Sequence, residues 1–292
     1  MKNNGRLFFV KSKDVVVLII ITICLSSLIY FQGCSHDNEN PVQPEQKKEF
    51  SGETTAGQWK PVLITSVLNY RLQAPPDVSS NQTKAELNEL HSLQTSSNDQ
   101  IISNINYWNN KGIIRWNEIA RHLVIKNGVN PPKASRIYAL LSVSQYDALV
   151  AAWYNKYLFQ RQNPNWADNS ISTPVSLSAE PSYPSEHAVI ATVSSRILAY
   201  LFPKESDSLN YRAEMEKSSR LYAGANYRSD ISAGDSLGGL IADEVIKYAT
   251  SDNSDAVWTG TIPEGKQYWH SGMKPPQAPL LPAWGKTKPW LM

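Results

Sequence analysis

The sequence predicts an all-α protein, a helical bundle followed by an irregular C-terminal tail rich in proline and tryptophan. Three observations predict this fold class. From Trp59 onward, apolar residues recur at helical spacing, with little of the alternation that marks strands. The 292 residues suffice for one sizeable core, and 41% hydrophobic against 18% charged residues is typical of a globular protein. Proline and glycine stand at the ends of the predicted helices.

The apolar spacing predicts helices over residues 84–93, 99–109, 116–126, 133–159, 185–201, 206–222 and 229–250. Two prolines precede the longest of these, and Pro203 and Gly224 end two later ones. The stretch 162–183, with dispersed Pro, Asn and Ser, is predicted to be a loop. After residue 252 the tail cannot be helical throughout. Its aromatic side chains are expected to wrap over the helical core, with a carbohydrate- or lipid-facing surface as the alternative.

The N-terminus differs in character from the rest of the chain. Basic residues precede a nearly unbroken apolar run, 15–31, which is followed by Gln32, Gly33 and Cys34. This order is typical of a bacterial lipoprotein signal, in which the cysteine is lipidated. An uncleaved anchor is the alternative, because Phe31 stands where Leu is expected. Either way, the remainder is expected to be exported and held at a bacterial membrane, through lipidated Cys34 in the first case.

The chain is therefore divided into a signal or anchor (1–33), a polar tether (34–57) and a single α-helical domain (58–292). Removal of the signal takes away four basic residues and one acidic residue, which changes the net charge from +2 to −1. With no basic stripe elsewhere, nucleic acid is not an expected partner. Cys34 would be the one remaining cysteine, so no disulfide is expected.

Two segments carry residues suited to binding an oxyanion. In Pro184-Ser185-Glu186-His187, Ser185 is a good N-cap, and His187 falls in the first helical turn, where free N–H groups and the helix dipole favour an anion. The alternative is an ordinary capped helix with a surface histidine. The second segment, 219–230, turns through a glycine from one helix to the next and begins with Ser-Arg. An arginine at such a corner suits a tetrahedral oxyanion, and the alternative is a helix corner with surface charges.

These segments resemble the motifs of the type 2 phosphatidic acid phosphatase / vanadium-dependent haloperoxidase superfamily. The second motif of that superfamily, Pro-Ser-Gly-His, is matched with Glu186 in place of glycine. The third, Ser-Arg, five residues, His, three residues, Asp, is matched at Ser219, Arg220 and Asp230, with Asn226 in place of the histidine. The resemblance covers residues 116–250 and implies the helical bundle of that superfamily.

The first motif, Lys, six residues, Arg-Pro, is matched by Lys156, with Asn163 where the arginine would stand. Arg161 is expected to reach the same anion instead. A cluster of cations at a helix C-terminus is the alternative. The resemblance then implies that Lys156, Arg161, Ser185 and Arg220 bind phosphate.

The resemblance also implies that His187 is the general acid and that Asp230 supports the residue at position 226. The histidine of that position is the nucleophile in phosphatases and the vanadium ligand in haloperoxidases. Asn226 can do neither, because its nitrogen lone pair is delocalised and it offers no imidazole. The helix dipole favours a carboxylate in the first turn, so Glu186 is expected to point to solvent.

Three functions remain open. The first is hydrolysis of phosphate esters, with attack by His187 or a water; His122 or His270 could also enter the pocket. The second is halide oxidation with vanadate as cofactor, and the third is binding of a phosphate-containing small molecule or lipid without catalysis. No His/Cys spacing indicates zinc, and no other metal is expected. Asp147, within an apolar helix, is expected to cap or pair in the core.

Overall fold

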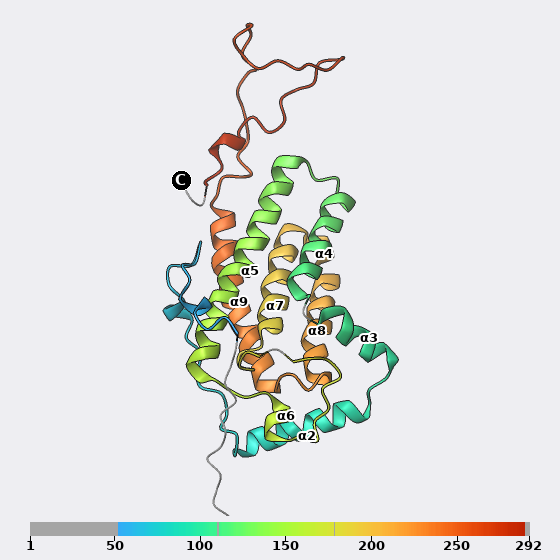
Figure 1. The fold of residues 1–292 in the computed structure, drawn as a ribbon. Coiled ribbons are helices and arrows are strands. Elements are labelled where there is room, and N and C mark those ends of the chain that lie inside the picture. The colour runs from blue at the N-terminus through green and yellow to red at the C-terminus, as the bar shows by residue number, and fades with distance from the viewer. Residues whose placement is uncertain (1–51, 110, 178, 290–292) are drawn as a thin grey trace, which may run out of the picture. The chain divides into compact units, whose positions relative to one another are not determined.

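A computed structural model describes residues 52–109, 111–177 and 179–289. Figure 1 shows that they form a bundle of helices, and no strand occurs among them. The α-helices are α2 (Asn81–Thr95), α3 (Asp99–Trp108), α4 (Gly112–Lys126), α5 (Pro131–Phe159), α6 (Pro164–Ala167), α7 (Glu186–Leu201), α8 (Ser206–Tyr222) and α9 (Arg228–Thr250). Short 3₁₀ helices are η1 (Ala56–Gln58), η2 (Val67–Tyr70), η3 (Pro203–Glu205) and η4 (Trp284–Lys286). The predicted all-α fold is confirmed.

Helix α7 is the central element, because it packs against α5, α8 and α9 and also contacts α4. Its side chains are buried nearly all round, as expected of a helix enclosed by others. Its start is fixed by Ser185, whose hydroxyl accepts a hydrogen bond from the backbone N–H of Ala188, which confirms the predicted cap. The first turn of α7 is thus held inside the bundle, where buried side chains of neighbouring helices surround it.

Close contact between α7 and α9 depends on glycine. A Cβ added at Gly234 would lie 2.5 Å from the carbonyl oxygen of Ser185 and 2.8 Å from the Cβ of Ala188. The backbone N–H of Ser185 also donates to the carbonyl oxygen of Asp230, at 3.0 Å. The start of α7 and the start of α9 are therefore locked together by backbone packing.

Asp147 attaches the N-terminal segment to α5. Its carboxylate is fully buried and accepts hydrogen bonds from the backbone N–H groups of Val62, Leu63 and Ile64, at 2.7, 2.8 and 2.9 Å. Three donors satisfy a carboxylate that would be costly to bury alone. The expectation that Asp147 caps within the core is confirmed.

Three local features differ from the sequence-based expectation. The predicted loop 162–183 contains the one-turn helix α6, which begins at Pro164, a residue suited to a first helical turn. Ala56 and Gly57, assigned to the tether, are buried in η1, which packs on α5. Most of the tail does not wrap over the core, since Trp269 is 56% exposed and Figure 1 shows the tail running away from the ends of α5 and α9. Its end returns to α9, where the hydroxyl of Tyr248 donates to the carbonyl oxygen of Lys288 at 2.8 Å. The helices cover one another's apolar faces and leave the tail little to pack on.

The predicted signal 1–33 and the lipidation site Cys34 lie outside the described residues. Within the described ranges, no helix combines the length and apolar character needed to cross a bilayer.

Candidate active site

His187 is oriented by a buried carboxylate that the sequence did not reveal. The Nδ1 atom of His187 lies 2.8 Å from Oε1 of Glu216 on α8, and Glu216 accepts a second hydrogen bond, at 2.6 Å, from the indole N–H of Trp116. Glu216 is fully buried. A carboxylate that accepts Nδ1–H fixes the imidazole tautomer and leaves Nε2 as the basic nitrogen. The one sequence signal for Glu216 is its position, one helical turn before the Ser219-Arg220 pair.

Lys156 and Glu186 form a buried ion pair at the start of α7. The Nζ atom of Lys156 lies 2.7 Å from Oε2 of Glu186 and also donates to the carbonyl oxygen of Pro181. The expectation that Glu186 points to solvent is wrong, since its side chain is only 23% exposed and faces the lysine. The attraction between the Glu186 carboxylate and the buried ammonium group of Lys156 outweighs the preference for an exposed position in the first helical turn. Burial favours the neutral acid, but Lys156, His187 and Arg220 together lower the pKa of Glu186 to about 2.

Arg220 supplies a second buried cation. Its Nη1 donates to the side-chain oxygen of Asn109 at 3.2 Å, whereas its buried Nε has no hydrogen-bond partner among the described residues. Burial lowers the pKa of Arg220, against the opposing effect of Glu186 and Glu216. A buried donor without a partner is costly and marks a place that a ligand or water can fill.

Arg220, Lys156, Glu186 and Asn226 line a shared cavity of about 20 Å³. This space holds one water molecule and is too small for a phosphate group. We call this cavity the cradle, and the carboxylate of Glu186 forms part of its wall.

Asn226 is held by both ends of its amide. Its Nδ2 donates to the carbonyl oxygen of Ser182 at 2.8 Å, and its Oδ1 accepts from the hydroxyl of Ser185 at 3.2 Å. Ser185 is fully buried, so its hydroxyl serves both this contact and the cap of α7. Asn226 therefore has a structural role in joining the α8–α9 corner to the start of α7.

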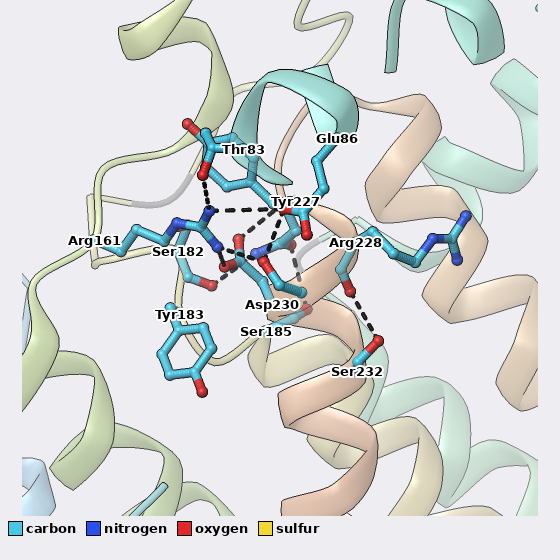
Figure 2. Close-up of polar contacts among 12 residues, drawn as sticks. Thr83, Glu86, Arg161, Ser182, Tyr183, Ser185, Tyr227, Arg228, Asp230 and Ser232 are labelled. Carbon is cyan, nitrogen blue, oxygen red and sulfur yellow. Dashed lines mark hydrogen bonds and ion pairs between the residues drawn. The ribbon is translucent and has the colours of Figure 1, made fainter. Parts of the chain in front are cut away.

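Arg161 does not join the cradle. Figure 2 shows its guanidinium within a separate buried network, where Nη1 donates to Oδ1 of Asp230 and to the hydroxyl of Ser229, each at 2.7 Å. Glu86 of α2 lies 3.6 Å away, and the guanidinium stacks 3.8 Å from the centre of the Tyr227 ring. The carboxylates among these partners balance the charge of the Arg161 guanidinium, which was expected from the sequence to bind an external anion.

Asp230 is fully buried and lies at the centre of that network (Figure 2). It accepts from Arg161, from the backbone N–H of Tyr227 at 2.9 Å, and from Ser182. Burial raises its pKa, and Arg161 acts in the opposite direction. Asp230 therefore pairs with Arg161, whereas the resemblance implied that it supports the residue at position 226.

His122 and His270, which could have entered the pocket, lie apart from this site. His122 of α4 lines a different cavity together with Glu205 and Arg212, and His270 is exposed in the tail. In the described part of the chain, no group of three or more His, Cys, Asp or Glu residues is arranged to hold a metal ion.

The site thus combines two buried cations with a carboxylate-held histidine at the start of the central helix of the bundle. Residues 137–253, which carry most of this site, match the model of the PAP2 superfamily. Comparison with curated proteins gives no match. The match to this superfamily supports an activity of the phosphatase or haloperoxidase type in general terms.

Solved structures agree with the fold. A bacterial vanadium-dependent iodoperoxidase is similar at 20% identity and a TM-score of 0.61, over 68% of this chain and 58% of its own. A holo-type bacterial vanadium-dependent chloroperoxidase is similar at 14% identity and a TM-score of 0.57, over 68% of this chain and 55% of its own. A transmembrane PAP2-type phosphatidylglycerolphosphate phosphatase from Bacillus subtilis shares 16% identity at a TM-score of 0.44, over 60% of this chain and 89% of its own. The chain therefore spans little more than half the length of the two peroxidases.

Proposed function

We propose that this protein binds phosphate esters at Lys156, His187 and Arg220 and hydrolyses phosphoric monoesters. The observation that carries the proposal is the His187–Glu216 pair, whose oriented imidazole shares Glu186 as a neighbour with the buried cations Lys156 and Arg220. Such a pair has the geometry of a general acid, and buried cations stabilise the charge of a transferring phosphoryl group.

The chain's own residues define the chemistry. Lys156 and Arg220 would hold the non-bridging oxygens once the carboxylate of Glu186 has left Lys156. Protonated His187 would donate its Nε2 proton to the leaving alcohol oxygen as the ester P–O bond breaks. A water would form the new P–O bond and release its proton to the phosphate product. Phosphoryl transfer has a loose transition state, so positioning and charge stabilisation matter more than a strong nucleophile.

A phosphate-binding protein without turnover is the second candidate, and Asn226 favours it. Both ends of its amide are bonded within the protein, and an amide does not form a covalent phosphoryl intermediate. Vanadate, the cofactor that haloperoxidase activity would need, does not fit these residues. Asn226 stands at the position of the ligand histidine, and its amide offers no imidazole to vanadium.

Hydrolysis of p-nitrophenyl phosphate by the mature chain tests the first candidate against the second. We expect slow, metal-independent turnover that His187→Ala abolishes, whereas His122→Ala, which changes a histidine of another cavity, leaves it unchanged. Wild-type turnover at the background rate would remove the hydrolase proposal and leave the binding protein. If Asn226→His then produces turnover from an inert parent, the cradle is intact and the nucleophile alone is missing.

We further propose that the protein is exported and lipid-anchored through Cys34, because a basic region, an apolar run and Gly33-Cys34 follow one another at the N-terminus. Cys34→Ala should prevent labelling by a palmitate analogue and release the protein from the membrane fraction. A wild-type chain that takes up no label would contradict the anchor.

A further inference from the structure

Glu186 and Glu180 both line two cavities that differ in chemistry, and Glu186 is the one paired with Lys156. The first is the small cradle with Lys156 and Arg220. The second is a cavity of about 450 Å³ that reaches His187 and is also lined by Glu186. The walls of this larger cavity, the apolar chamber, include Ile113, Ile114, Leu149, Trp153 and Ile190. Glu186 thus borders both the chamber that reaches His187 and the cradle that contains Lys156.

The cradle is incompletely satisfied by the protein's own groups. Lys156 is 1% exposed and has Glu186 at 2.7 Å, whereas Arg220 keeps a buried Nε without a partner among the described residues. A carboxylate carries one charge and two oxygens, whereas a phosphate group carries more of both. A phosphate could therefore replace Glu186 on Lys156 and satisfy Arg220 as well, provided that displacement of the carboxylate is compensated.

We propose that Glu186 is a specificity-determining residue, which excludes inorganic phosphate from the cradle and admits organic phosphates whose apolar group fills the chamber. This inference rests on the proposed phosphate-ester binding. Inorganic phosphate must displace Glu186 for its contacts with Lys156 and Arg220 alone. An alkyl or aryl phosphate also buries apolar surface against Trp153 and its neighbours, and each buried methylene is worth roughly fourfold in affinity.

Binding of phosphonates separates this role from catalysis, because they are not hydrolysed. Calorimetry on the mature chain would compare inorganic phosphate with methyl-, butyl- and hexylphosphonate. For the wild type we expect affinity to rise at least tenfold from methyl to hexyl and inorganic phosphate to bind weakly. In Glu186→Gln, inorganic phosphate should bind at least tenfold more tightly than in the wild type. Glu186→Gly serves the same purpose if the glutamine variant does not fold.

Two matched variants define the controls. Glu244→Gln changes a carboxylate of an exposed pair with Lys247 on α9 and should leave all affinities unchanged. Ile113→Asp, at an exposed position of the chamber, should weaken the rise of affinity with the chain length of the phosphonate. The double variant Glu186→Gln/Ile113→Asp should still bind inorganic phosphate more tightly than the wild type does.

Equal affinity of wild type and Glu186 variants for inorganic phosphate, or no dependence on chain length, overturns the proposal. Binding of no phosphonate at all overturns it together with the proposed binding function. Chain-length-dependent phosphonate binding without ester turnover supports it and removes only the hydrolase activity.

Discussion

Arg161→Met tests whether Arg161 serves the fold, as its contacts indicate, or an external anion, as its position in the sequence suggested. Methionine keeps a flexible apolar stem of similar reach and removes the charge. Asp230 is fully buried, and its Oδ1 lies 2.7 Å from Arg161, so the variant leaves a buried carboxylate without its cation. Removal of one partner of such a pair typically costs about 3–5 kcal/mol. Because Tyr227 and Ser182 still donate to Asp230, we expect about 3 kcal/mol, near the lower end of that range.

Urea unfolding followed by circular dichroism measures this loss as a lower midpoint at unchanged slope. The double variant Arg161→Met/Asp230→Asn should lose clearly less than the sum of the single losses, because the two groups interact directly. Arg196→Met is the matched control, since Arg196 pairs with Asp243 at the surface, where such a change costs roughly 1 kcal/mol or less. A stable Arg161→Met variant that loses phosphonate binding would refute this reasoning and indicate that Arg161 binds the external anion.

Three further predictions concern the start of α7. Glu216→Gln should lower kcat roughly 100-fold with KM little changed, because the carboxylate orients the imidazole of His187. Glu186→Gln should destabilise the protein by about 3 kcal/mol at pH 7. The folded-state pKa of Glu186 is depressed, so its contribution to stability is present above the ordinary pKa of 4.5. The difference in unfolding free energy between variant and wild type, measured in urea, should therefore shrink as pH falls from 4.5 towards about 2. A constant difference over that range would contradict the ion pair. Gly234→Ala should cost about 1–3 kcal/mol in thermal unfolding through its clash with the start of α7, whereas Gly272→Ala, with open space around it, should change stability by less than about 0.5 kcal/mol.

The helices and their ends could be predicted from the sequence because the signals are local. Apolar spacing, the cap at Ser185 and the glycine after α8 each act within a turn or two of the backbone. Predicted and observed bounds of the long helices differ by no more than a few residues at either end. The tail was predicted less well, because its many aromatic residues indicate burial without indicating a surface that would cover them.

The internal arrangement of the site depended on contacts between distant residues. Glu216 and His187 are 29 residues apart in the sequence, and Ser229 and Glu86 are 143 residues apart. Helix packing brings each pair into contact, and no local sequence pattern encodes that packing. For Glu186, a first helical turn suits both a solvent-facing and a buried carboxylate, and the buried Lys156 decides between them. Asn226 was recognised as a departure from the superfamily pattern, but its two hydrogen bonds depend on the fold.

The attachment of the N-terminal segment to Asp147 also bears on the order of events during synthesis. The backbone donors of residues 62–64 leave the ribosome 83 to 85 residues before the carboxylate that accepts their hydrogen bonds. Until α5 has been made, this segment has no native partner at that position, and Asp147 in turn enters the core only when a loop of that length has closed. Docking of residues 62–64 must therefore wait for α5, even though these residues are translated before every long helix of the bundle.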